Sequence, residues 1–365
     1  MGLFLLGSVL LVCVWAWANV EGSPALLANE SSKFVWTTAD LPPRKQWGTN
    51  YGYCGETSTV AALLKFGSYF SQWDVRDIAV LYDPRNNQQH WYSVGTNDQI
   101  ASTKLRMQFV EFASYDPSSS TEKYYGWLKE MTKAGHAVTM TVFMNHYLFS
   151  GGIKKDPTYG FHFYDHIVSV AKVESNFDDN LFHDDDIITF SDNGLWCPDE
   201  GNCPYYFRYS FKEFCGNRTT SNAPEGPIYT MPCDKMQSNM LNFGIAHTGV
   251  RDTDGETIPV VVSTNLNYER PEPVPRSDER PKPMPLTLTV RIAAKHLKAG
   301  EQYVLYRYDS ETLVPYGQFN AQSNNALRRW EFVPSPKVAS ADFVVTEEIM
   351  SDEKAIYRCV RANAL

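Results

Sequence analysis

Two kinds of hydrophobic pattern divide the chain. In its first half, apolar residues recur at helical spacing over Glu56–Phe66 and Thr121–Ala134, and Gly135 follows the second segment as a C-terminal helix cap. β-branched and apolar runs come next and predict strands over Ala137–Phe143, Ile167–Val173 and Ile187–Phe190. Helices first and a mostly β half afterwards indicate an α+β fold.

The pattern changes after about Leu241. Short strand-like runs follow one another with turn residues and no helical pattern between them, which is typical of a β-sandwich. The predicted strands are Ile258–Ser263, Leu286–Ile292, Gln302–Tyr308, Arg329–Val333, Asp342–Glu347 and Ala355–Val360. A proline-rich segment, residues 269–285, should be an extended loop within this unit. The sequence therefore predicts one domain over residues 45–240 and a C-terminal β-sandwich over 241–365.

The N-terminus carries the one long hydrophobic run, Leu3–Trp17, which is too short for a comfortable membrane span. Ala16-Trp17-Ala18 matches the pattern of a signal-peptide cleavage site, so residues 1–18 are interpreted as a secretory signal peptide. An uncleaved anchor is the alternative. An irregular segment with Pro42-Pro43 fills residues 19–44. The sequence thus predicts a secreted protein with no membrane span.

Composition excludes some classes of partner and cofactor. The 365 residues are 43% hydrophobic, enough for a sizeable core, and the net charge of −9 without a Lys/Arg run argues against nucleic-acid binding. The acidic cluster His183–Asp186 has no calcium-loop spacing and is interpreted as a solvated loop. Neither a metal nor a cofactor is predicted.

Cysteines and sequons support secretion. Six cysteines remain after the predicted cleavage: Cys54, Cys197, Cys203, Cys215, Cys233 and Cys359. Proximity suggests the disulfides Cys197–Cys203 and Cys215–Cys233, although sequence cannot fix connectivity. Asn29 and Asn217 open glycosylation sequons, which fit the same oxidising compartment.

A candidate nucleophile lies where the first helix begins. Cys54 is flanked by Gly52 and Gly55 and precedes an apolar helical face, where the helix dipole would lower a thiol pKa. Gln46, or else Asn50, could donate to an oxyanion beside the Cys54 N–H. The structural alternative is that Cys54 is one of six disulfide cysteines.

Two later segments supply a candidate base and its orienting group. His166 opens the strand Ile167–Val173 and could accept a proton from a thiol, although a lone histidine there is more often structural. The strand Ile187–Phe190 leads to Asp192 and Asn193, either of which could accept a hydrogen bond from the imidazole. Alternation places Asp192 on the face of the strand's core residues. Taken alone, this segment reads as a turn.

The order of these segments resembles the papain-like cysteine peptidases, closest in pattern to the bacteriocin-processing branch. The stretch Trp127–Met140 is similar to the helix, turn and strand that precede the histidine in that branch, and the resemblance covers about Lys45 to Trp196. It implies a papain-like fold for residues 45–240. Cys54 matches the nucleophile, His166 the base and Gln46 the oxyanion glutamine. Asp192 matches the third member in the branch that uses aspartate, and Asn193 is the fallback.

Two functions follow as hypotheses. The first is a secreted thiol hydrolase, a peptidase, amidase or acyl transferase, whose β-sandwich positions a peptide or amide substrate or docks to a surface-bound partner. The departures from the family include Glu56 after Cys54-Gly55 and a Gln46 further upstream of Cys54 than the family's glutamine. The rival is a non-catalytic secreted binding protein on the same scaffold, with Cys54 in a disulfide. If Cys54 is free, Cys359 is the expected unpaired cysteine.

Overall fold

The computed structural model describes residues 32–38, 43–47, 52–80, 92–149, 164–197, 204–218, 222–233, 242–252, 258–266, 286–316, 325–335 and 341–362. The predicted signal peptide and the proline-rich segment 269–285 lie outside these residues, as do Asn29, Asn50 and Cys203. Within them, no helix is both long and apolar enough to cross a membrane.

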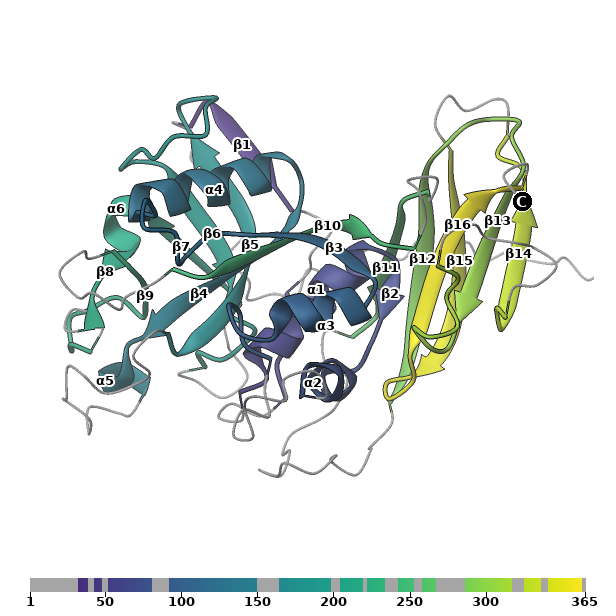
Figure 1. The fold of residues 1–365 in the computed structure, drawn as a ribbon, viewed down its shortest axis with the longest axis horizontal. Helices are drawn as coiled ribbons and strands as arrows, with labels where there is room; N and C mark the ends of the chain where they lie inside the picture. Colours follow the sequence, from purple (N-terminus) through teal and green to yellow (C-terminus); the bar gives the residue numbers. More distant parts are fainter. Residues whose placement is uncertain are drawn as a thin grey trace, which may run out of the picture.

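A large sheet organises the first part of the chain (Figure 1). Its central order is β3-β10-β4-β5-β6-β7, with β1 on β5, and β9 pairing with both β4 and β8. The strands are β1 (Phe34–Thr37), β3 (Met107–Glu111), β4 (Ala137–Met144), β5 (His166–Ser175), β6 (Ile187–Ser191), β7 (Tyr206–Ser210), β8 (Cys215–Gly216), β9 (Tyr229–Pro232) and β10 (Gly244–Val250). All of these pairings are antiparallel except β8 with β9. Helices and an antiparallel sheet make the fold α+β, as the sequence predicts.

The helices lie on both sides of this sheet (Figure 1). They are α1 (Cys54–Lys65), α2 (Gln72–Val80), α3 (Asp98–Lys104), α4 (Thr121–Lys133), α5 (His146–Phe149) and α6 (Phe211–Phe214). Ser120 begins α4 by accepting a hydrogen bond from the Lys123 N–H, and Gly135 follows its end at φ +76°, a conformation that glycine adopts without strain. The predicted helix Thr121–Ala134 is therefore present, one residue shorter.

Side-chain alternation along β4 separates two hydrophobic cores. Val138, Met140 and Val142 face α4 in what we call the second core, which also contains Tyr124 of α4 and Tyr229 of β9. On the opposite face, Ala137 packs against Ala61 and Ala62 of α1. What we call the first core lies on the α1 side and contains Cys54, Ile167 and Phe243. Cys54 therefore belongs to the first core, and Tyr229, on which the His166 ring stacks, belongs to the second.

The C-terminal strands form two smaller antiparallel sheets (Figure 1). One has the order β11-β12-β15 and the other β14-β13-β16-β2. Their strands are β2 (Ser68–Tyr69), β11 (Val260–Thr264), β12 (Thr287–Leu297), β13 (Tyr303–Tyr308), β14 (Arg328–Phe332), β15 (Ala341–Met350) and β16 (Ala355–Arg361). All six strands predicted from sequence after Leu241 are present with shifted ends.

The two parts of the chain share structure in a way that the sequence pattern did not indicate. β10 follows the predicted boundary at Leu241 yet pairs with β3 and β4, so the first sheet extends beyond residue 240. In the other direction, β2 leaves the N-terminal part and pairs with β16, where the buried Tyr69 donates its hydroxyl to the Ser351 carbonyl. The first core runs from α1 into both C-terminal sheets. The boundary at 240/241 is therefore wrong by one strand, and the two parts form one packed body.

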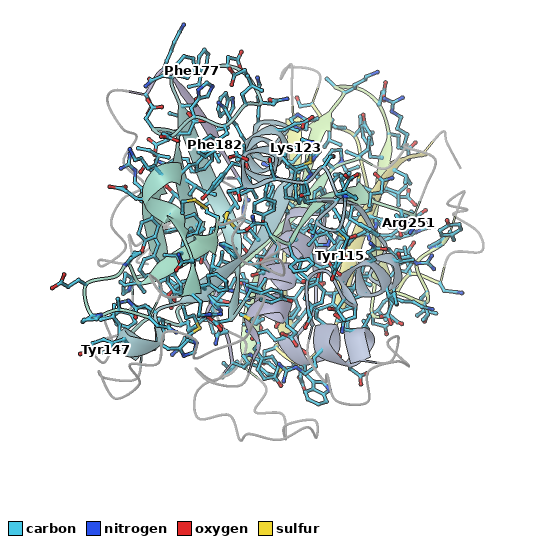
Figure 2. The ribbon with its side chains drawn as sticks, turned by 60° about the vertical axis from the view of Figure 1, so that its left-hand side comes forward. Tyr115, Lys123, Tyr147, Phe177, Phe182 and Arg251 are labelled. Atoms are coloured by element: carbon cyan, nitrogen blue, oxygen red, sulfur yellow. A yellow bond between two sulfur atoms is a disulfide. The ribbon has the colours of Figure 1, made fainter. Side chains whose placement is uncertain are left out.

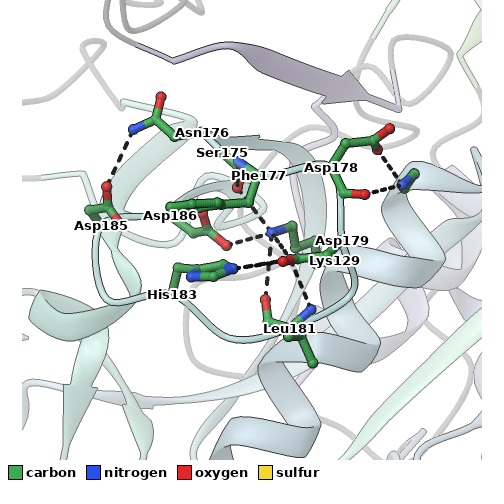
Figure 3. Close-up of polar contacts among 11 residues, drawn as sticks. Lys129, Ser175, Asn176, Phe177, Asp178, Asp179, Leu181, His183, Asp185 and Asp186 are labelled. Atoms are coloured by element: carbon green, nitrogen blue, oxygen red, sulfur yellow. Dashed lines mark hydrogen bonds and ion pairs between the residues drawn. The ribbon is translucent and has the colours of Figure 1, made fainter.

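The acidic segment between β5 and β6 folds around a lysine. Figure 2 shows Phe177, which lies in this segment, at the edge of the molecule, and Figure 3 shows the polar contacts of the segment with Lys129. Lys129 of α4 is fully buried and donates to Asp186 at 3.0 Å, to Asp179 at 3.1 Å and to Ser175 Oγ at 2.9 Å. The predicted solvated loop is thus partly buried, and the Lys129 ammonium neutralises its inner carboxylates.

Candidate active site

Cys54 is the first residue of α1, and its thiol is free and 9% exposed. The next residue explains why the chain can pack so closely here. A Cβ at Gly55 would lie 2.6 Å from the Tyr92 ring and 2.7 Å from the Tyr92 carbonyl oxygen, so only glycine fits. Because Cys54 is free, the disulfide that the binding-protein hypothesis assigned to it is absent, and Cys359 is the second free cysteine.

Burial raises the pKa of the Cys54 thiol to about 12, and the negative charge of Glu56 adds to this effect. Hydrogen bonds from the backbone of Ile167 and Gly55, together with the charge of Arg76, act in the opposite direction but are outweighed. The sequence predicts a lowered pKa from the start of the helix. That prediction is wrong for this structure. The free energy lost when the thiolate is removed from water is larger than the stabilisation that the helix N-terminus provides.

The residue that departs from the family pattern, Glu56, anchors the segment before Cys54. It is fully buried, and its Oε1 accepts from Arg76 Nε at 2.7 Å and from the Tyr92 N–H at 3.1 Å. Arg76 also donates to the Gly52 carbonyl at 2.6 Å and lies 3.5 Å above the Tyr53 ring. This buried ion pair ties α2 to the turn that presents the thiol.

His166 is the first residue of β5 and is 1% exposed. Its Nε2 lies 3.0 Å from the main-chain oxygen of Asp192, and its ring stacks on Tyr229 at 5.7 Å. A carbonyl only accepts hydrogen bonds, so Nε2 carries the proton and Nδ1 is left as the basic nitrogen. Burial lowers the pKa of His166 to about 4, so the ring is neutral at physiological pH.

The sequence predicts a hydrogen bond between the Asp192 side chain and the imidazole, but the carboxylate has other partners. Its carboxylate accepts from the Gly194 and Trp196 N–H groups, each at 2.9 Å, and from the Tyr229 hydroxyl at 3.0 Å. Burial nevertheless raises the pKa of Asp192 to about 7. Asp192 therefore meets His166 through its backbone, while its carboxylate holds the turn after β6 and the ring on which His166 stacks.

Asn193 points to the other side and fastens the start of α1. Its Nδ2 lies 3.1 Å from three acceptors, the Cys54 carbonyl, Ser58 Oγ and the Ile167 carbonyl. The residue has a φ of +60°, which asparagine tolerates better than most residues. The fallback assignment of Asn193 to the imidazole is not what the structure shows, because this amide contacts the nucleophile's helix.

The structure brings the candidate residues together but leaves the nucleophile and base apart. Cys54 belongs to the first core with Ile167, whereas His166 lies against Tyr229 of the second core. Within the described part of the chain, no hydrogen bond joins the Cys54 thiol to the imidazole. Adjacent residues of β5 point to opposite faces of the strand, so Ile167 packs with Cys54 while His166 stacks on Tyr229.

Gln46 lies beside this arrangement. It is 4% exposed, and its N–H donates to the Asn193 carbonyl at 2.9 Å. Gln72 of α2, which sequence reasoning missed, holds the same segment to α1. Its Oε1 accepts from the Trp47 N–H and from Thr57 Oγ1, both at 2.8 Å, and its Nε2 donates to the Lys45 carbonyl at 2.9 Å. No motif marks a glutamine at the start of a short helix, so this role depends on tertiary contacts.

The other predicted sites lie away from the thiol. Cys215–Cys233 is a disulfide as predicted, and Cys197 is also disulfide-bonded, while its proposed partner Cys203 is outside the described residues. Asn217 follows β8 and is half-buried. Among the described residues, no group of three or more His, Cys, Asp and Glu is placed to hold a metal ion.

Comparisons with known proteins find only distant structural likeness. No family model and no curated protein matches the chain. Two solved structures of the clostridial cysteine protease Cwp84 are each 13% identical to it. One, solved after propeptide cleavage, covers 90% of this chain and 84% of its own, with a TM-score of 0.31. The other comprises the cysteine protease and lectin-like domains of this surface-layer-associated protein of Clostridium difficile. It covers 94% and 77%, with a TM-score of 0.26.

Proposed function

We propose that this protein is a papain-like thiol hydrolase in which Cys54 is the nucleophile and His166 the base. The observation that carries the proposal is a free cysteine at a helix start that shares a core with Ile167, the neighbour in β5 of an imidazole with a fixed tautomer. The Cys54 sulfur receives backbone hydrogen bonds from Gly55 and Ile167, and His166 is the residue next to Ile167. The Asp192 carbonyl takes the Nε2 proton, which leaves Nδ1 to act as a base.

The mechanism follows from these atoms. His166 Nδ1 removes the proton from Cys54 Sγ as the sulfur attacks an amide or ester carbonyl carbon. The Cys54 N–H and the Gln46 side chain stabilise the oxyanion. The imidazolium then protonates the departing amine or alcohol, and a water molecule, deprotonated by Nδ1, hydrolyses the thioester. No hydrogen bond joins the two side chains among the described residues, so in this proposal the imidazole turns toward the thiol when substrate binds.

We also interpret the two C-terminal sheets as the faces of a β-sandwich. In this proposal it holds a peptide substrate or docks to a surface-bound partner, and the protein works outside the cell as a glycoprotein after removal of residues 1–18. The finer resemblance to the bacteriocin-processing branch stays a prediction.

The non-catalytic alternative also has an observation in its favour. The Cys54 thiol and the His166 imidazole are both buried and neutral at pH 7, because burial raises the thiol pKa and lowers the imidazole pKa. A structural cysteine on a binding scaffold would look the same. The alternative therefore survives without its disulfide, and reactivity has to separate the two functions.

Cys359 provides a matched control for that test, because it is also free and buried, and burial raises its pKa to about 12 as well. A peptidyl fluoromethyl ketone, which needs an assisted thiol, should alkylate Cys54 and leave Cys359 unmodified, as read by peptide mass spectrometry. His166→Gln should abolish this labelling while circular dichroism stays unchanged. Equal and slow modification of both cysteines, with no effect of His166→Gln, would establish the binding-protein alternative.

A further inference from the structure

A second feature of the molecule is an acidic cavity between α3, β3 and the start of β10. It has a volume of about 390 Å³, and its lining includes the carboxylates of Asp98, Glu111 and Asp116. None of the described residues that line it is a lysine, arginine or histidine. The cavity therefore concentrates negative charge without an internal cation to neutralise it.

Two of these carboxyl groups, Asp98 and Glu111, are neighbours, and each has a buried oxygen that no other described residue reaches with a donor. Asp98 is 1% exposed, and its Oδ1 accepts from the Gly95 N–H at 3.0 Å. Glu111 accepts from the Gln99 side chain through Oε2. The remaining buried oxygens are Asp98 Oδ2 and Glu111 Oε1. Burial and the neighbouring Glu111 raise the pKa of Asp98 well above its usual range, so Asp98 retains its proton.

The rest of the lining suits an organic cation. Phe112, Tyr115 and Phe243 supply aromatic rings, and the Tyr115 and Phe243 rings meet edge to face at 5.7 Å. Tyr115, labelled in Figure 2, is 71% exposed, so this part of the lining faces solvent. Aromatic faces attract ammonium and guanidinium groups and accommodate their alkyl stems. A metal ion would need more oxygen ligands than two carboxylates give, and no group of three potential ligands is found among the described residues.

Tyr164 lies against the lining of the cavity. The Tyr164 hydroxyl donates to the carbonyl of Val94, a lining residue, at 3.0 Å, and its ring lies 5.9 Å from that of Phe243. The negative charges of both Asp98 and Cys54 contribute to the raised pKa of Tyr164. Cys54 belongs to the same core as the lining residues Val94 and Phe243, so a substrate with its reacting carbonyl at Cys54 can place a neighbouring side chain in this cavity.

We propose that this cavity binds an ammonium or guanidinium group through Asp98 and Glu111. Resting on the proposed hydrolase function, we infer that this group is a basic side chain of the substrate close to the bond that is cleaved. The cation takes the place of the Asp98 proton. Its N–H groups donate to the buried oxygens Asp98 Oδ2 and Glu111 Oε1.

Binding can be measured without catalysis. Isothermal titration of Cys54→Ala protein with agmatine, which carries both cationic groups, should show saturable binding, and the neutral butylurea should bind at least about tenfold more weakly. Agmatine binding should release a proton near pH 7, seen as a heat that depends on the ionisation enthalpy of the buffer. The tyrosines that feel the charge of Asp98, Tyr92 and Tyr164, have raised pKa values and remain neutral there.

Asp98→Asn is the decisive variant. Asparagine keeps the acceptor for Gly95 and can donate to Glu111, so the protein should remain as stable as before while agmatine affinity falls about tenfold or more. Asp116→Asn is the matched control, because it removes an equal charge from a side chain that is fully exposed, and it should change affinity less than about threefold.

Three results would overturn the inference: no agmatine binding, unchanged affinity in Asp98→Asn, or calcium binding at Asp98 in preference to agmatine. These outcomes are separate from failure of the hydrolase proposal. An unreactive Cys54 with intact agmatine binding would reject the hydrolase and keep the cation site. A reactive Cys54 in a protein that ignores agmatine would do the reverse.

Discussion

Replacement of Asn193 tests how the start of α1 is held. The Nδ2 group has two hydrogens, so at most two of its three contacts, to the Cys54 carbonyl, Ser58 Oγ and the Ile167 carbonyl, are full hydrogen bonds at one time. Loss of two buried bonds costs about 1–3 kcal/mol in net hydrogen bonding, and more where a carbonyl stays unsatisfied. Asn193→Gly keeps the φ of +60° accessible and should therefore lower the unfolding free energy by about 2–4 kcal/mol.

Two further variants separate the backbone effect from the side-chain effect. Asn193→Ala should cost about 1 kcal/mol more than Asn193→Gly, because an L-residue with a Cβ is strained at positive φ. Asn193→Asp should be the most damaging, since it turns a carboxylate toward two carbonyl oxygens. Ser58→Ala is the control, because both hydrogens of Nδ2 still have carbonyl partners, and it should cost less than about 1 kcal/mol.

Urea denaturation at constant m-value gives these differences, and fluoromethyl ketone labelling of Cys54 reports the site. The destabilised variants should label more slowly than the wild type even where they are fully folded, because the start of α1 is no longer fixed. The reasoning is refuted if Asn193→Asp is as stable as the wild type, or if Asn193→Ala is more stable than Asn193→Gly.

Three other outcomes are expected. Lys129→Met leaves the buried Asp186 unpaired, so urea denaturation at pH 7 should show a loss of about 3–5 kcal/mol that shrinks at low pH as Asp186 takes up a proton; a loss that does not change with pH contradicts this. Burial lowers the pKa of His247 to about 4, so its contribution is complete above pH 6.5 and is lost as pH falls toward 4. The wild type should therefore lose about 2 kcal/mol more unfolding free energy between pH 7.5 and pH 5 than His247→Gln does. The same pH profile in both proteins would count against this prediction. Residues 258–362 expressed alone should be protease-sensitive, because they lack β2 and the α1 side of the first core; a protease-resistant fragment would show an autonomous domain.

Much of the local structure could be predicted from the sequence. The segments now seen as α4, β4 and the C-terminal strands show strong periodicity over several residues, and periodicity is a local property that survives in any tertiary arrangement. The two-residue strand β2 and the short helices α2 and α3 give no such signal. No strand was predicted at β10, and the boundary at 240/241 placed its residues in the C-terminal part because a sequence pattern does not show with which strand a segment pairs.

By itself, the sequence determined which chemical groups occupy special positions: a cysteine where a helix begins, a histidine where a strand begins, and an Asp-Asn turn after the next strand. Only the tertiary structure decided which atoms of these residues meet. Asp192 reaches His166 through its carbonyl, Asn193 holds α1, and Cys54 and His166 lie in different cores. The direction of the pKa shift at Cys54 could not be predicted from the sequence either. Burial outweighs the effect of the helix N-terminus there, and burial depends on residues distant in the chain. The pairing of Asp98 with Glu111 has the same origin, since packing of α3 against β3 brings the two carboxylates together.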